Sequence, residues 1–156
     1  MKKDKSFLSK AIEIAGYSLE NGGGPFGAVI VRNGKIISEA YNRVVLNNDP
    51  TAHAEILAIR QASSVLRSYD LTGCTLYSSC EPCPMCLGAI YWSGIKKIVY
   101  ASGRNDAAGA GFNDDLIYNE IMLDPGKRKV TFLYLPDSGA KEIFNKWEEM
   151  ENKTPY

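Results

Sequence analysis

The sequence is poor in several features, and each absence excludes a class of protein. There is no surplus of charge, because 18 basic residues balance 18 acidic ones. A broad basic surface for a polyanion is therefore not expected, and neither is a nucleic-acid partner. No stretch approaches the roughly 20 apolar residues that span a membrane. The charged segment Met1–Lys5 lacks the apolar run of a signal peptide, so a cytoplasmic location is the expectation.

Histidine and cysteine are also scarce, with one histidine, His53, and four cysteines in 156 residues. Repeats, low-complexity tracts and linkers are absent, and an apolar content of 45% suits one compact domain over residues 1–156. Cys83 and Cys86 have Cys-x-x-Cys spacing. In a cytosolic enzyme this spacing favours metal or redox chemistry over a structural disulfide.

Hydrophobic periodicity and turn residues predict helices that alternate with strands. Asn33-Gly34 is the dipeptide typical of a two-residue type I′ hairpin turn. The predicted helices span residues 6–21, 51–66, 84–93, 114–122 and 140–151, and the predicted strands span 26–32, 35–41, 75–78, 97–101 and 130–135. Loops are predicted at residues 42–50 and 102–111. Because a helix connects the strands at 75–78 and 97–101, these two strands should be parallel. Together the elements predict an α/β fold in which a five-stranded mixed sheet is flanked by helices.

His53, Cys83 and Cys86 offer one imidazole and two thiolates, which are three ligands for a tetrahedral zinc ion. A structural zinc usually has four protein ligands, whereas a catalytic zinc keeps one position for water. His53 is expected in the first turn of its helix, and Cys83 directly precedes Pro84 at the start of the next one. The positive ends of helices stabilise thiolates. Helix starts that follow parallel strands converge at the carboxyl edge of a sheet, where ligands bind in open α/β folds.

Three other interpretations of these residues stay open. A thioredoxin-like motif also places Cys-x-x-Cys at a helix start and needs no histidine. Cys80 lies three residues before Cys83 and is a possible fourth ligand, which would close the site to water, whereas Cys74 is typical of a buried strand residue. His53 alone would be read as a hydrogen-bonded, partly buried side chain.

Glu55 is the proton-handling group that a catalytic zinc site requires. Zinc lowers the pKa of a bound water to about 7. A nearby carboxylate can take the water proton and pass it to a ring nitrogen and then to a leaving amine. Two residues along a helix correspond to about 200° of rotation, so Glu55 and His53 would not share a face of a regular helix. Both can still border a cavity at the first turn.

Three segments, Gly24–Ile30, Asn48–Glu55 and Ser79–Cys86, resemble the cytidine/deoxycytidylate deaminase superfamily. His-x-Glu followed by Pro-Cys-x-x-Cys is the signature of zinc-dependent base deaminases. Within the superfamily the segments look like the branch of bacterial guanine deaminases and tRNA adenosine deaminases. The resemblance covers nearly the whole chain and implies a three-layer αβα cytidine-deaminase-like fold.

Two further segments favour the guanine deaminases within that branch. One is Ala110–Asp115, with Tyr118 and Glu120 downstream, and the other is the extended C-terminal helix that ends near Tyr156. The resemblance then implies hydrolysis of guanine to xanthine and ammonia by zinc-bound hydroxide that attacks C2.

The resemblance also implies roles for single residues. His53, Cys83 and Cys86 would hold one zinc ion per subunit, and Glu55 would be the catalytic proton shuttle.

The resemblance extends to the contacts with the substrate and to the assembly. Phe26 would stack on the purine, Asn42 would hydrogen-bond it, and Asp114 would accept hydrogen bonds from the N–H groups of guanine. The protein would be a homodimer that exchanges its C-terminal segment, about residues 130–156, so that Tyr156 closes the partner's active site.

Each substrate contact has a structural alternative. Phe26 could belong to the core, Asn42 could cap a turn, and Asp114 could cap the following helix. Asp115 is adjacent and could take the place of Asp114 in either role.

Other functions also fit the same zinc motif. A related deaminase could act on guanosine, on an aminotriazine such as ammeline, or on cytosine. A tRNA adenosine deaminase should carry a basic docking face. A non-catalytic zinc module should hold the ion with four ligands, Cys80 included.

Overall fold

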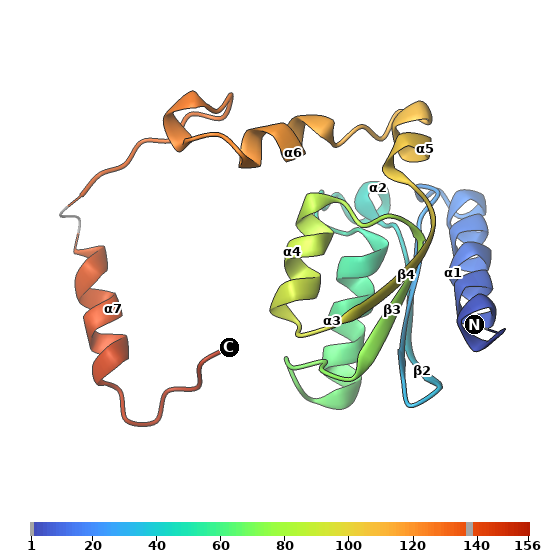
Figure 1. Ribbon diagram of the computed structural model, residues 1–156, viewed down its shortest axis with the longest axis horizontal. Helices are drawn as coiled ribbons and strands as arrows, with labels where there is room; N and C mark the ends of the chain where they lie inside the picture. Colours follow the sequence, from blue (N-terminus) through green and yellow to red (C-terminus); the bar gives the residue numbers. More distant parts are fainter. Residues whose placement is uncertain (1, 137–138) are drawn as a thin grey trace. The chain divides into compact units, whose positions relative to one another are not determined.

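The computed structural model describes residues 2–136 and 139–156, and these residues form two compact units. The first unit ends at Asp114, and the second runs from Asp115 to Tyr156. Figure 1 shows the elements of both. The helices are α1 (Lys2–Glu20), α2 (Val44–Asn47), α3 (Ala54–Leu66), α4 (Pro84–Trp92), α5 (Arg104–Gly109), α6 (Asp115–Ile121) and α7 (Ala140–Glu149), with a 3₁₀ helix at Pro125–Lys127.

The first unit is built on a four-stranded sheet with the order β2-β1-β3-β4. The strands are β1 (Gly27–Arg32), β2 (Lys35–Tyr41), β3 (Cys74–Cys80) and β4 (Lys97–Ser102). β1 is antiparallel to both β2 and β3, whereas β3 and β4 are parallel. The predicted hairpin and the predicted parallel crossover through the helix at 84–93 are therefore both confirmed.

Helices cover both faces of this sheet (Figure 1). Alternate residues of β1 point to opposite faces, as the pleat of a strand requires. Ala28 and Ile30 belong to a core cluster with residues of α3 and α4, whereas Val29 and Val31 pack with α1. Gly27 allows α1 to lie directly on the strand, because a Cβ there would be 2.3 Å from the carbonyl oxygen of Ala11.

The turn between β1 and β2 has the predicted chemistry. Asn33 and Gly34 both have positive φ, 51° and 73°. This left-handed backbone is what a type I′ turn requires at its two central residues.

The predicted fifth strand is wrong. Residues 130–135 form no strand, and Val130, Leu133 and Tyr134 are 69%, 79% and 85% exposed. The β-branched and aromatic residues of this segment favour a strand only where a neighbouring strand and a covered face are available. In the part of the chain that the structure describes, this segment has no strand partner, and the sheet therefore has four strands.

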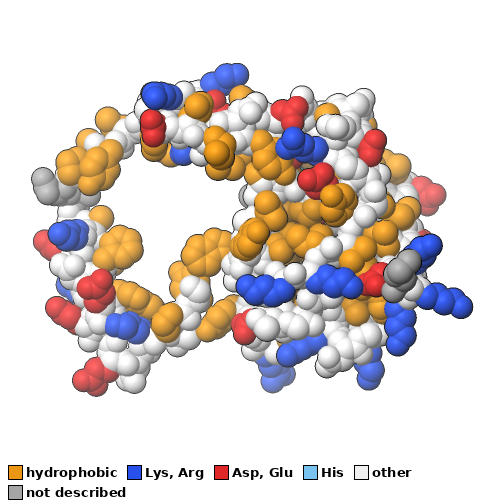
Figure 2. Space-filling view, viewed as in Figure 1, with side chains coloured by type: hydrophobic (Ala, Val, Ile, Leu, Met, Phe, Trp, Pro, Cys, Tyr) orange, Lys and Arg blue, Asp and Glu red, His pale blue; other side chains and the backbone are white. Residues whose placement is uncertain are grey.

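The second unit leaves its apolar side chains uncovered (Figure 2). Its described helices, α6 and α7, have no buried residues, and Ile143, Phe144 and Trp147 of α7 are 65%, 70% and 40% exposed. Arg128 holds the turn after α6 together, because its Nε donates to the carbonyl oxygens of Glu120 and Leu123 at 3.0 and 3.1 Å.

Two short helices lie in segments that were predicted to be loops. α2 lies in the polar loop after β2, and α5 lies in the small-residue segment after β4. The start of α5 is fixed by Asp106, whose carboxylate accepts the backbone N–H of Gly103 at 2.9 Å.

Among the described residues, no helix is both long and apolar enough to span a membrane.

Candidate active site

The candidate site lies at the sheet edge where β2 and β3 end. The start of α3 follows β2, and the start of α4 follows β3, so both helix starts are placed at this edge. His53 is the N-cap residue of α3, and Cys83 is the N-cap residue of α4, with Pro84 at the first helical position. The prediction placed His53 within the first turn, but the helix begins one residue later.

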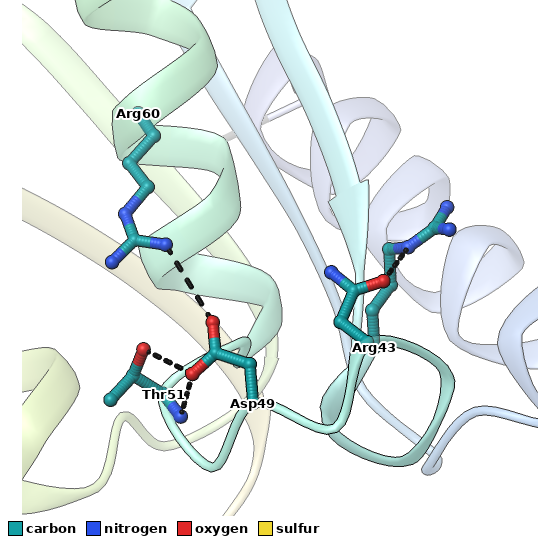
Figure 3. Close-up of polar contacts among 5 residues, drawn as sticks. Arg43, Asp49, Thr51 and Arg60 are labelled. Atoms are coloured by element: carbon teal, nitrogen blue, oxygen red, sulfur yellow. Dashed lines mark hydrogen bonds and ion pairs between the residues drawn. The ribbon is translucent and has the colours of Figure 1, made fainter.

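The loop before His53 is held in shape by Asp49, as Figure 3 shows. One carboxylate oxygen of Asp49 accepts the backbone N–H of Thr51 at 2.8 Å and its hydroxyl at 2.7 Å. These hydrogen bonds, the side-chain one first, lower the pKa of Asp49. Arg60 of α3 lies 3.9 Å from the other carboxylate oxygen. At the start of the loop, Arg43 donates to Asn47 at 3.2 Å. These contacts fix the conformation of the loop that ends at His53.

His53, Cys83 and Cys86 converge. The Sγ atoms of Cys83 and Cys86 each lie 3.6 Å from Nδ1 of His53, and all three ligand atoms lie within 4.8 Å of one another. A tetrahedral zinc with Zn–N of about 2.05 Å and Zn–S of about 2.3 Å would separate its nitrogen and sulfur ligands by about 3.5 Å. The observed spacing therefore fits a zinc ion held by these three side chains.

Cys80 does not belong to this group. Its thiol instead points to the carbonyl oxygen of Gly103, 3.7 Å from Sγ, and burial raises its pKa. Among the described residues, the metal-binding group contains three ligands, as a catalytic zinc site does. Cys74 is buried in β3, as predicted.

Glu55 lies beside the three ligands. It is only 5% exposed, and its Oε2 lies 3.5 Å from Sγ of Cys86. His53 has an extended backbone, with φ −69° and ψ 153°, rather than a helical one. The 200° separation of a regular helix therefore does not apply, and both side chains reach the same site.

The three ligand side chains shift one another's pKa values. A hydrogen bond from the Cys86 thiol and another with His53 lower the pKa of Cys83 to about 4, although burial opposes this shift. The hydrogen bond to Cys83, with burial second, raises the pKa of Cys86 far above its ordinary value. The same contact with Cys83 raises the pKa of His53. One thiolate is therefore preformed beside the imidazole at neutral pH, in the ionisation state that binds zinc.

Burial has the opposite effect on the carboxylate. It raises the pKa of Glu55, and the backbone N–H of Glu55 itself partly opposes the shift by donating to the carboxylate. A raised pKa makes a carboxylate a better proton acceptor, as a proton shuttle requires.

Phe26 and Asn42 lie at the same edge. The backbone N–H of Asn42 donates to the carbonyl oxygen of Phe26 at 3.0 Å, and the side-chain oxygen of Asn42 accepts the backbone N–H of Val44 at 3.2 Å. Asn42 therefore does cap a turn, and only 7% of it is exposed. Phe26 packs partly against the core cluster under α3.

Phe112 extends this aromatic surface, and it was not predicted as a site residue. Its ring meets that of Phe26 edge-on, with centroids 4.9 Å apart. Nothing in the sequence indicates this pairing, because 86 residues separate the two rings. Asp114 is the last residue of the first unit, and Asp115 begins α6. Tyr156 is 83% exposed at the end of the second unit. The substrate roles of Asp114 and Tyr156 stay predictions.

Comparisons with known proteins agree with this site. Residues 1–102 match the model of the cytidine and deoxycytidylate deaminase zinc-binding region. The chain is 48% identical to the guanine deaminase of Bacillus subtilis (strain 168) over 97% of its own length and 98% of that protein. An X-ray structure of guanine deaminase from Bacillus subtilis matches at 48% identity, with a TM-score of 0.95 over 97% of this chain and 98% of that one.

A second group of relatives acts on RNA. The chain is 46% identical to the tRNA-specific adenosine deaminase of Aquifex aeolicus (strain VF5), over 90% of its own length and 91% of that protein. Because residues 1–102 match the family model and contain the three metal ligands, this chain belongs to the cytidine and deoxycytidylate deaminase family of zinc-binding enzymes.

Proposed function

We propose that the protein is a guanine deaminase, which hydrolyses guanine to xanthine and ammonia. The observation that carries the proposal is the convergence of His53, Cys83 and Cys86 with the buried carboxylate of Glu55 at one sheet edge. Likeness to the guanine deaminase of Bacillus subtilis along 97% of the chain supports guanine as the substrate. The balanced charge, 18 basic against 18 acidic residues, favours a small substrate over tRNA.

The chemistry divides between the metal and Glu55. A zinc ion held by His53, Cys83 and Cys86 would polarise a water molecule so that it attacks at neutral pH. Glu55 takes a proton from that water and delivers it to a ring nitrogen of guanine. It then takes the proton of the hydroxyl group now on C2 and passes it to the amino group, so that C2–O becomes a carbonyl as the bond from the amino group to C2 breaks. Water adds one oxygen to C2 and ammonia leaves, so guanine and water become xanthine and ammonia.

Three side chains form the proposed pocket for the purine. Phe26 stacks on the ring, next to Phe112. Asn42 has its oxygen committed to Val44, which directs its amide N–H groups toward acceptors of the base. Asp114 accepts hydrogen bonds from the N–H groups of guanine. A carboxylate only accepts, and adenine has an acceptor at N1 where guanine has a donor, so Asp114 selects guanine.

We further propose that the active form is a cytoplasmic homodimer with one zinc per subunit, in which the subunits exchange the segment from about residue 130 to 156. The exposed apolar residues of α7 and of residues 130–135 support this, because a second subunit could cover them (Figure 2). Tyr91 and Trp92 at the end of α4 are 74% and 72% exposed and offer a further contact surface. Tyr156 would then close the active site of the partner.

A substrate panel tests the proposed reaction. Zinc-loaded protein is incubated with guanine, guanosine, ammeline, cytosine, adenine and a tRNA anticodon stem-loop, and ammonia release is measured by a coupled assay with product identification by chromatography. The proposal predicts xanthine from guanine, with kcat/KM highest for guanine. Faster turnover of another substrate would assign the enzyme to that substrate. No turnover of any substrate with zinc bound would contradict catalysis altogether.

A further inference from the structure

One buried contact of Glu55 comes from outside the metal-binding motifs. The hydroxyl of Ser78 donates to Oε1 of Glu55 at 3.1 Å. Ser78 lies on β3, is 1% exposed, and faces α3 on the same side of the strand as the core residue Leu76. A buried hydroxyl in such an apolar layer needs a partner, and the described partner is the carboxylate.

The two oxygens of Glu55 therefore have different surroundings. Oε1 accepts from Ser78 on the sheet side, whereas Oε2 lies 3.5 Å from Sγ of Cys86, on the metal side. A carboxylate held at one oxygen cannot rotate freely about its last torsion. The hydrogen bond thus keeps the other oxygen directed at the site where water and substrate would react.

We infer that Ser78 is a positioning residue, which fixes the orientation of the Glu55 carboxylate for proton transfer. This inference rests on the proposed function, because it assigns Ser78 to the same proton transfers. Ser78 touches neither the metal ligands nor the proposed purine contacts in any described hydrogen bond. Its effect passes through Glu55, so it should act on turnover rather than on substrate binding.

The test compares Ser78→Ala with a matched variant, Ser38→Ala. Ser38 is also a buried strand serine, 6% exposed, and its hydroxyl donates to α3, at the carbonyl oxygen of Ala58, 2.8 Å away. No described hydrogen bond joins it to Glu55. Both variants lose one buried hydrogen bond between the sheet and α3, so they share the structural consequence and differ only in the carboxylate.

The first readout is steady-state kinetics on zinc-loaded protein, with zinc content measured for each variant. Ser78→Ala should lower kcat by about 10- to 100-fold, because a misoriented proton shuttle costs part of the general acid–base contribution. Its KM should stay within about threefold of the wild-type value, as expected where binding contacts are untouched. Ser38→Ala should keep the wild-type kcat. Equal kcat in the two variants, or a loss confined to KM, would overturn the inference.

The second readout needs no substrate. Protein labelled with ¹³C at the glutamate side-chain carboxyl gives one resonance per glutamate, and Glu55→Gln identifies the resonance of Glu55. Ser78→Ala should shift that resonance, in both zinc-loaded and metal-stripped protein, whereas Ser38→Ala should leave it in place. An unshifted resonance in Ser78→Ala would overturn the inference.

The kinetic readout and the carboxyl resonance together also separate this inference from the proposed function. If wild-type protein fails to deaminate guanine, the proposed substrate is wrong. The kinetic comparison is then made with whichever substrate of the panel is hydrolysed, and the carboxyl resonance still decides whether Ser78 orients Glu55.

Discussion

Replacing Glu55 with glutamine isolates proton transfer from every other property of the site. Glutamine has nearly the same volume as glutamate and keeps an oxygen that can accept from Ser78, which donates to Oε1 in the wild-type protein. It cannot accept a proton from water. The zinc ligands are unchanged, so zinc content should equal that of the wild type.

The size of the effect follows from what is removed. A positioned general acid–base contributes about 10²- to 10⁴-fold to a rate, which corresponds to about 2.7–5.5 kcal/mol of activation free energy. Because the proposed mechanism uses Glu55 for both the water and the leaving amine, we expect kcat to fall toward the upper end of that range. KM should change little, since the proposed purine contacts lie on other residues.

Although Glu55→Gln should lower kcat, it should not lower the stability of the metal-stripped protein. Burial raises the pKa of Glu55 above its ordinary value of 4.5. The folded state therefore disfavours the carboxylate, and metal-stripped wild-type protein loses stability as the pH rises above that value. Glutamine removes this penalty. Metal-stripped Glu55→Gln should be at least as stable as the wild type at pH 7, with the difference shrinking toward pH 4.

The assay is steady-state guanine deamination by zinc-loaded protein, with zinc content and thermal unfolding measured on the same preparation. Glu13→Gln serves as the control, because Glu13 is exposed on α1 and pairs only with Lys10 in the described contacts. A kcat for Glu55→Gln within tenfold of the control, at equal zinc content, would remove Glu55 from the mechanism.

Four further variants test the ligand set, the packing of α1 on the sheet and the carboxylate of Asp4. Cys86→Ser should lower zinc affinity and abolish activity, whereas Cys80→Ser should retain both, as zinc titration with a chelating dye would show; zinc loss in Cys80→Ser would favour a closed structural site. Gly27→Ala should destabilise the fold by about 1–3 kcal/mol in urea unfolding, since the new Cβ would stand 2.3 Å from the backbone oxygen of Ala11, and a neutral result would refute the close approach of α1. Hydrogen bonds from Lys97 of β4 and Tyr77 of β3 lower the pKa of Asp4 well below its ordinary value of 3.8. The stability that Asp4 contributes is therefore present above about pH 4 and is lost as the pH falls below that value. Asp4→Asn should lose less stability than the wild type in an acid titration, and identical profiles would contradict this.

The metal site could be predicted from the sequence because its geometry is local. His53 and Cys83 are N-cap residues, and Pro84 at the first helical position marks the start of α4. Cys86 lies one turn after Cys83. The site also requires that the two helix starts lie at the same sheet edge, and the order of strands and helices dictates this.

Other features depend on contacts that a single sequence does not display. Residues 130–135 have strong strand propensity, yet propensity does not supply the neighbouring strand that a sheet needs. Phe112 reaches Phe26 only through the fold. Ser78 carries no signal at all, since a serine in a strand gains its meaning from the carboxylate that lies across from it. The substrate roles of Asp114 and Tyr156 stay predictions, and that of Tyr156 would also require the proposed partner subunit.

The most direct test of the central claim is ammonia release from guanine by one preparation in three states: zinc-loaded, stripped of metal by a chelator, and reloaded with zinc. We predict formation of xanthine and ammonia in equal amounts by the loaded enzyme, loss of activity on stripping, and recovery on reloading. Zinc bound at His53, Cys83 and Cys86 without deamination of any substrate in the panel would contradict the account. So would deamination that is indifferent to the metal.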